Sequence, residues 1–381
     1  MVRMESHGLW PRLARAFGAL RSRTRADGNH RFQDPIGKGV CPVKRALFCC
    51  IPILFLFLMG QANPLFAKRK PLARPKLDKI EHQPTGRSLR ADPKTGEPLV
   101  YDVEGAITYD RRSGNFLLRW TGRRGKRLTV VYEPRLKVDA IVSAAVIYDS
   151  GGNAYRYLYS LRSLPSSQQK LQSFYVETRA PVEKVTSPDL SWHAFHLTDH
   201  QKQHLQIAGG RQWSQTRQGQ VGLLPGTDAS GFSYESAGLP GPVKCYAEGR
   251  TSLQDVGEEI SEELLVAVGK ADWIIPQGFT VGPEIPAQPF RAGPFLQKIA
   301  GYISVSVEQG WIESTQVAEE IRKSLEQLHD AVERRDRRQS DSILRDLMAR
   351  VESEKDKALL SEAYALLKFN LEYLQQRLRV D

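Results

Sequence analysis

The sequence predicts two consecutive folding units, an all-β (Ig-like) sandwich over residues 99–290 and a small antiparallel four-helix bundle over residues 294–379. Short runs of alternating polar and apolar residues predict the first unit. Apolar residues that recur every three or four positions predict the second. The chain has 381 residues, of which 41% are hydrophobic, and this content is sufficient for two separate cores.

The predicted strands are rich in Val, Ile, Tyr and Phe, as in "RLTVVYE" and "LQSFYVETR", and turn sequences such as "SGGN" and "PGTDASG" separate them. This spacing is typical of a sandwich. In "AYRYLYSL" the two-residue period places Tyr155, Tyr157 and Tyr159 on one face. An exposed row of tyrosines could stack on sugars, but we expect this row to face the core. A helix is possible at 253–266.

The helical period begins at Phe295 and continues in four apolar stripes. Gly310 ends the first stripe and Ser314 is the expected N-cap of the second. Because the links between the stripes are short, neighbouring helices are expected to run antiparallel. The stripes are Leu296, Ile299, Ile303, Val307; Val317, Ile321, Leu325, Leu328, Val332; Ile343, Leu344, Leu347, Met348, Val351; and Leu359, Leu360, Ala363, Leu367, Leu371, Leu374, Leu378.

The N-terminal region reads as an export signal. Residues 44–67 combine a basic start, an apolar run and a small-residue exit, which predicts a signal peptide cleaved after Ala62 or Ala67. An uncleaved anchor is the alternative. Residues 1–43 form a long basic extension, which we interpret as a possible artefact of start-site choice. The Pro- and Lys-rich residues 68–98 predict a linker. The expected location is secreted or periplasmic, in the cell envelope.

The charge of the chain is concentrated in this leader. The net charge is +11, but residues 1–79 carry +12 and the remainder carries −1. A nucleic-acid-binding protein would keep its positive charge on the folded surface, so we expect no nucleic-acid partner. Cys245 is the single cysteine after the predicted signal, which excludes an internal disulfide there, and its sequence context predicts a buried strand residue.

The stretch "WHAFHLTDHQKQH" at 192–204 holds four histidines. A structural zinc site needs three or four ligands that converge from different segments. Here the histidines follow at spacings of 3, 4 and 4, so that at most one pair, His196 with His200 or His200 with His204, could bind one ion. In a strand, His193 and His196 would lie on opposite faces. We therefore expect no metal site.

No catalytic motif is present, since the sequence contains no GxSxG, no GxxxxGK[ST] and no GxGxxG after a strand. A pair of carboxylates for glycoside hydrolysis is recognised only in three dimensions. We assign no catalytic residue and no cofactor. The acids available in the β region are Glu177, Glu183, Asp189, Glu235 and Glu248.

Two segments resemble known proteins. Residues 154–249, with "AYRYLYSLRSLPSSQQKLQSFYVE" and "LLPGTDASGFSYESAGLPGPVKCYAEG", are similar to a β-sandwich of uncharacterised exported bacterial proteins. That resemblance implies that Trp192 and Trp213 are core or strand residues. Residues 294–379 resemble the FIMAH domain of secreted bacterial proteins, on the evidence of "FLQKIAGYISVSVEQGWIESTQVAEEIRKSLEQLHDAVERRD". The family is an accessory helical module, and its usual Ala- and Asn-rich third helix is Asp- and Arg-rich here.

We therefore expect an exported, non-enzymatic binding or structural (adhesion-type) protein. Its partner would be an extracellular or cell-envelope protein or polysaccharide, and membrane contact would occur only through an uncleaved signal. The alternatives are a secreted hydrolase acting on extracellular polymer, or an exported protein that binds metal through residues 193–204.

Overall fold

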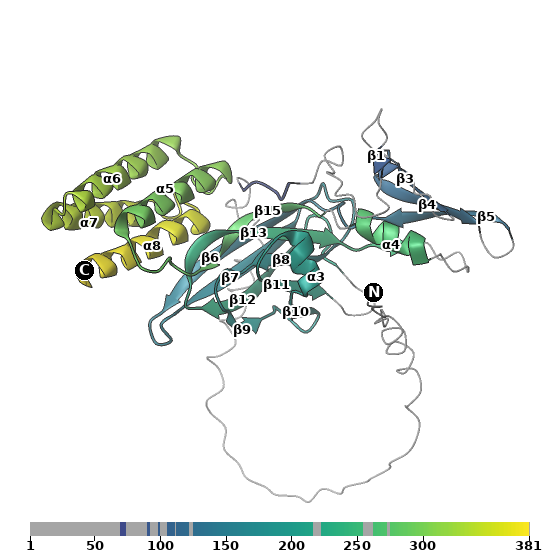
Figure 1. Ribbon diagram of the computed structural model, residues 1–381, viewed down its shortest axis with the longest axis horizontal. Helices are drawn as coiled ribbons and strands as arrows, with labels where there is room; N and C mark the ends of the chain where they lie inside the picture. The colour runs from purple at the N-terminus through teal and green to yellow at the C-terminus, as the bar shows by residue number, and fades with distance from the viewer. Residues whose placement is uncertain are drawn as a thin grey trace, which may run out of the picture. The chain divides into compact units, whose positions relative to one another are not determined.

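The computed structural model describes residues 69–73, 90–91, 98–99, 105–110, 112–121, 125–215, 222–253, 262–272 and 275–380. The predicted N-terminal extension (1–43), the predicted signal (44–67) and most of the predicted linker lie outside these residues. Within them, the strands form three antiparallel sheets that precede the C-terminal helices (Figure 1).

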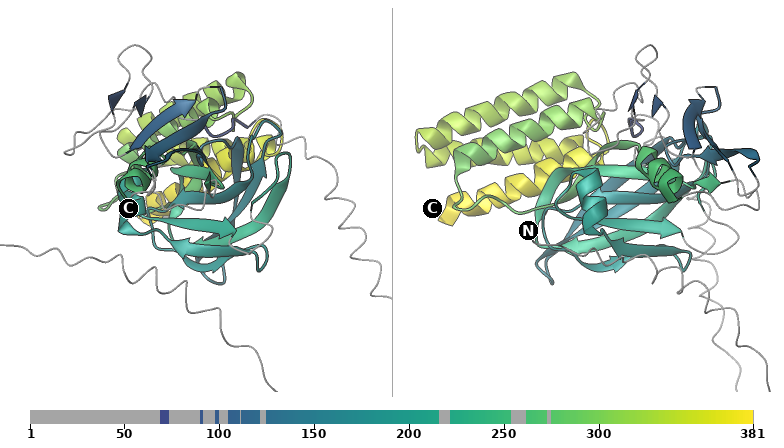
Figure 2. Two further views of the ribbon diagram at one scale, coloured as in Figure 1. Left: turned by 90° about the vertical axis from the view of Figure 1, so that its right-hand side faces the viewer. Right: turned by 45° about the vertical axis from the view of Figure 1, so that its right-hand side comes forward.

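Two of the sheets form a sandwich (Figures 1 and 2). The five-stranded sheet has the order β10 (Trp192–His196), β11 (Gly210–Gln215), β8 (Leu171–Glu177), β13 (Leu239–Gly249) and β15 (Gln277–Glu284). The four-stranded sheet has the order β6 (Ala140–Asp149), β7 (Ala154–Ser163), β12 (Asp228–Ser236) and β9 (Glu183–Thr186).

Aromatic side chains join the two sheets. Trp213 of β11 is fully buried, stacks on Phe174 with ring centroids 5.0 Å apart, and lies 5.8 Å from Tyr159 of β7. Tyr157 and Tyr159 have exposures of 0% and 1%, which confirms that the tyrosine row faces the core rather than solvent. Buried Trp192 and Cys245 also confirm their predicted positions. Large flat rings fill the inter-sheet space with few rotatable bonds, which favours a well-ordered core.

A third sheet was not expected. The sequence predicts one sandwich from 99 to 290, but part of this region forms a six-stranded sheet with its own core. Helix α4 (Glu262–Ala271) packs on it through Leu264 and Val268. Alternation alone cannot assign a strand to a particular sheet. Its order is β1 (Arg90–Ala91), β2 (Pro98–Leu99), β3 (Gly105–Asp110), β4 (Asn115–Thr121), β5 (Arg127–Glu133) and β14 (Ser252–Leu253).

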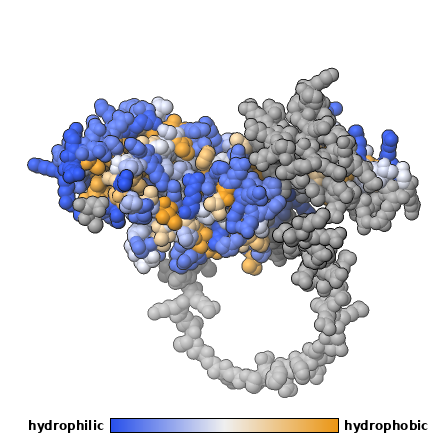
Figure 3. Space-filling model, viewed as in Figure 1, coloured by the Kyte–Doolittle hydropathy of each residue, from blue (hydrophilic) through white to orange (hydrophobic). Residues whose placement is uncertain are grey.

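The C-terminal helices run side by side (Figure 2, right), with α5 in contact with α6 and α8, and α7 in contact with α6 and α8. The side chain of Ser314 accepts a hydrogen bond from the Val317 amide at 3.3 Å, which confirms the predicted N-cap. On the face shown in Figure 3 the helical part is mostly hydrophilic, as expected if the apolar stripes point inward. The helices are α5 (Ala292–Glu308), α6 (Thr315–Glu333), α7 (Arg337–Glu354) and α8 (Ser361–Val380).

Helix α8 joins the helical part to the sandwich. The ring of Phe369 meets Tyr155 of β7 edge-on at 5.2 Å, and Asn370 donates a hydrogen bond to the Pro240 carbonyl at 2.8 Å. Buried side chains of the sandwich and of all these helices belong to one continuous apolar cluster. Removing α8 from the sandwich would therefore expose apolar surface on it.

The first residues of the predicted linker are bound to the sandwich and to α8, and they do not form a flexible tail. The Leu72 amide donates to the Ala140 carbonyl at 2.7 Å, and Leu72 itself is buried. Ala73 forms an antiparallel bridge with Gln277. Arg69 forms an ion pair with Glu362 of α8 at 2.9 Å. We call residues Arg69–Ala73 the N-terminal arm.

The Arg69–Glu362 pair is buried. The two side chains are 7% and 0% exposed, and a second hydrogen bond joins Nε of Arg69 to the carboxylate at 3.1 Å. The same carboxylate accepts the amide of Ala144 on edge strand β6 at 2.9 Å. One acid therefore connects the arm, the sandwich and α8, and its buried charge is compensated.

Among the described residues, no helix is both long enough and apolar enough to cross a membrane.

Candidate functional site

The histidine run folds as an edge strand followed by a short helix. In β10, Trp192 points into the sandwich, where its ring meets Phe232 edge-on at 5.0 Å. The other residues of the strand are exposed, including Phe195 at 43%. Strand β10 ends the order of the five-stranded sheet, so in the described part of the chain it pairs with β11 alone. It presents histidine and aromatic groups to solvent.

Helix α3 (Asp199–Leu205) is fixed at both ends. Thr198 caps its N-terminus in a capping box with Gln201, which satisfies backbone amides that would otherwise lack partners. At the other end Leu205 is buried and its carbonyl accepts a hydrogen bond from the Tyr246 hydroxyl at 2.6 Å. Tyr246 alternates with core residues of β13, so α3 lies on the outer face of the five-stranded sheet.

The structure brings two of the four histidines together. The Nε2 atoms of His200 and His204 lie 3.1 Å apart, with ring centroids at 4.4 Å and an angle of 69° between the rings. Burial, followed by the neighbouring His200, lowers the pKa of His204 below its ordinary value. His193 instead lies beside Phe195, with their ring centroids 6.3 Å apart. No group of three or more His, Cys, Asp or Glu suited to a metal occurs in the part of the chain that the structure describes.

A second polar cluster centres on Arg135. Its backbone amide and Nε contact the carboxylate of Asp272 at 2.7 and 2.8 Å, and Nη1 contacts Glu248 at 2.9 Å. The hydroxyl of Tyr132 also donates to Asp272. The Asp272 side chain is 0% exposed, and burial raises its pKa although Arg135 acts in the opposite direction. We call Arg135, Glu248 and Asp272 the arginine cluster.

Sequence reasoning identified Glu248 as an available acid but missed its partners. Arg135 and Asp272 are 137 positions apart in the chain, and each lies outside any recognisable motif. That Glu248 and Asp272 share one arginine is therefore apparent only in the three-dimensional structure. Both carboxylates accept charge-assisted hydrogen bonds from one guanidinium, which fixes their positions.

Three of the other acids singled out in the sequence have basic, hydroxyl or amide partners. Glu177 accepts two hydrogen bonds from Arg179, each at 3.1 Å, and a third from the Lys244 amide at 3.0 Å. Glu235 pairs with Lys184 at 2.6 Å, and Asp189 accepts from Ser191. Glu183 is exposed on β9. None of these contacts joins one carboxylate to another.

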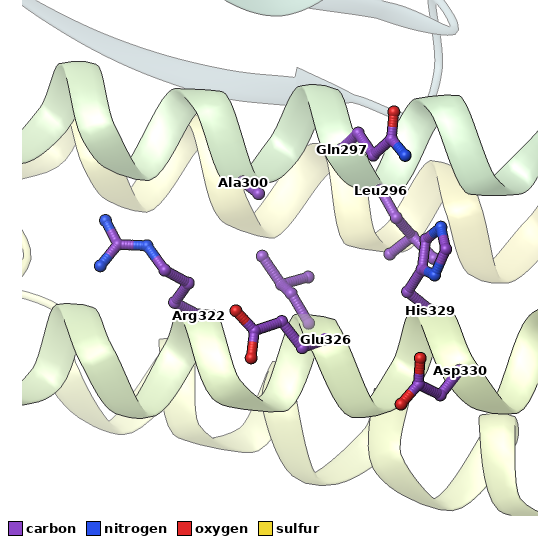
Figure 4. Close-up of a pocket in the computed structure, with 8 residues that line it drawn as sticks. Leu296, Gln297, Ala300, Arg322, Glu326, His329 and Asp330 are labelled. Carbon is purple, nitrogen blue, oxygen red and sulfur yellow. The ribbon is translucent and has the colours of Figure 1, made fainter.

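Two of the hollows among the described residues are candidates for ligand binding. One, of about 420 Å³, lies at the end of the sandwich and includes Glu183, Lys184 and Glu235, two of which form the ion pair just described. The other, of about 260 Å³, lies between α5 and α6 (Figure 4). Its floor is apolar, with Leu296 and Ala300, and its charged residues have both signs. A mixed rim of this kind shows no preference for a ligand of one charge.

Comparisons with known proteins do not assign this chain to a family. No family model matches this chain, and no curated protein matches it. A solved structure described as an uncharacterised protein from Nocardia farcinica with an immunoglobulin-like fold is similar to 36% of this chain and 96% of that chain, at 15% identity and a TM-score of 0.21. The resemblance to the FIMAH domain stays a prediction.

Proposed function

We propose that this chain is an exported, non-enzymatic binding or structural protein of the cell envelope. One observation carries the proposal: the tyrosine row and several buried acids are used to hold the fold together. Tyr157 and Tyr159 fill the core, Glu362 pairs with Arg69, and Arg135 binds both acids of the arginine cluster. An enzyme would instead keep such groups in a cleft, where they can reach a substrate.

The proposal includes the predicted organisation. Residues 44–67 act as the signal peptide, and α5–α8 form an antiparallel four-helix bundle that serves as a FIMAH-like accessory module. The contacts of each of these helices with two others support the bundle. The partner is an envelope protein or polysaccharide, and nucleic acid plays no part.

The contact surface we assign is the exposed side of β10. Edge strands with exposed apolar residues are sites of association. Phe195 is 43% exposed there, and the neighbouring loop residue Leu190 is 87% exposed. Phe279 provides a matched control, since it lies on β15 at the opposite edge of the same sheet with 37% exposure.

Binding to isolated cell envelopes from the source cells tests this proposal. Purified protein that begins at Lys68 should sediment with the envelopes in a saturable manner and release no soluble fragments over time. We expect Phe195→Ser to lower the affinity for the envelopes at least tenfold, because an exposed aromatic anchor is lost. Phe279→Ser should bind with the affinity of the wild type.

A hydrolase is the second candidate, because Glu248 and Asp272 converge on one guanidinium. Time-dependent release of sugar or peptide fragments that is abolished by Glu248→Gln, in a variant with a wild-type melting temperature, would replace the binding proposal with this one. Failure of wild-type protein to sediment with any envelope fraction would also contradict the binding proposal.

A further inference from the structure

We infer that His200 and His204 form a binding site for a divalent transition-metal ion. The two residues are four positions apart in α3, so both side chains lie on one face of the helix. Both are exposed to solvent. This inference does not depend on the proposed envelope function, because it concerns only these two side chains and the helix that carries them.

The spacing of the two nitrogens matches the requirement of one ion. A metal–imidazole bond is about 2.0–2.1 Å long, which places two nitrogens on the same ion about 2.9 Å apart at a right angle and about 3.3 Å apart at the tetrahedral angle. The observed Nε2–Nε2 distance of 3.1 Å lies between these values. An ion can therefore take the place of the hydrogen bond between the two rings, with small side-chain rotations and no movement of the backbone.

The helix is held in place without metal. The capping box of Thr198 fixes its first turn, and buried Leu205 fixes its last turn against Tyr175 and Tyr246. Gln206 then ends the helix in the left-handed conformation, with φ of 53°. A site on a rigid element loses little conformational entropy when it binds an ion.

The ligand set defines the class of ion. Neutral imidazole suits Cu²⁺, Ni²⁺ and Zn²⁺, whereas Ca²⁺ and Mg²⁺ require oxygen ligands. No group of three or more such ligands occurs within the described residues, so we assign these two imidazoles alone to the site. Two protein ligands are fewer than a structural zinc site has. The site is therefore an exchangeable surface site, with Cu²⁺ bound most tightly of the three ions.

Two matched double variants test this inference. His200→Ala/His204→Ala removes the pair, and His193→Ala/His196→Ala removes the other two histidines of the same run. The protein begins at Lys68 and carries no affinity tag. Ni²⁺ and Zn²⁺ are titrated by calorimetry, and Cu²⁺ is followed by electron paramagnetic resonance.

We expect wild type and the His193/His196 variant to bind one ion of each metal at this site with the same affinity. The His200/His204 variant should bind at least tenfold more weakly and lose the nitrogen couplings of two imidazoles from the Cu²⁺ spectrum. Equal melting temperatures of the metal-free proteins establish that each variant is folded. Equal metal affinity of the two double variants, or loss of binding only in the His193/His196 variant, would overturn the inference.

Discussion

Replacing Arg69 by alanine is expected to lower the free energy of unfolding by about 3–5 kcal/mol, because the buried carboxylate of Glu362 then loses its cationic partner. The side chain of Glu362 is 0% exposed, and Arg69 contacts it through both Nε and Nη2. The loss is measured by urea denaturation of protein that begins at Lys68.

The next residue of the N-terminal arm supplies the matched control. Lys70 is exposed, so Lys70→Ala should change the free energy of unfolding by less than about 0.5 kcal/mol. Glu362→Gln removes the buried charge but keeps an oxygen for the Ala144 amide, so Arg69→Ala/Glu362→Gln should recover part of the loss. Equal free energies of unfolding for Arg69→Ala and Lys70→Ala would show that the ion pair of the N-terminal arm does not stabilise the folded protein.

Replacing Arg135 by alanine should have an effect of similar size, about 3–5 kcal/mol, since two acids lose the cation that they share. Asp272 is fully buried and the Glu248 side chain is 11% exposed. Arg156, exposed on β7, is the control, and Arg156→Ala should be nearly neutral. Equilibrium denaturation of both variants at neutral pH measures the difference.

The deficit of Arg135→Ala should also depend on pH. Burial raises the pKa of Asp272, and Arg135 opposes that rise, so the pKa in the folded variant is higher than in the folded wild type. A raised carboxyl pKa contributes stability at low pH that is lost as pH rises through it. The deficit should therefore be smallest near pH 4 and grow towards neutral pH. A deficit that is constant over this range would contradict the assignment of the effect to Asp272.

Local patterns in the sequence predicted the parts of the fold that depend on neighbouring residues. The two-residue alternation placed Tyr157 and Tyr159 in the core, and Ser314 marked the start of α6. The predicted helix at 253–266 overlaps α4 (Glu262–Ala271) at residues 262–266 only, and its residues 254–261 lie outside the described ones. Such features follow from side-chain period and capping, which act over a few residues.

The features that sequence reasoning missed depend on residues far apart in the chain. Arg69 and Glu362 are separated by 293 positions, and nothing in "FAKRKP" indicates a buried ion pair. The third sheet was missed because an alternating strand does not specify its partner. For the histidines, the four-residue spacing of His200 and His204 was visible, but whether the segment is helical or extended determines if that spacing brings the rings together.

Export is the central claim, and the N-terminus of the protein isolated from its native cells tests it most directly. Intact mass and N-terminal sequencing of protein from the extracytoplasmic fraction should give a chain that begins at Asn63 or Lys68. Either start retains Arg69 and leaves its ion pair with Glu362 in place. Recovery of the chain from the cytosol alone, with residues 44–67 still attached, would contradict the proposed function.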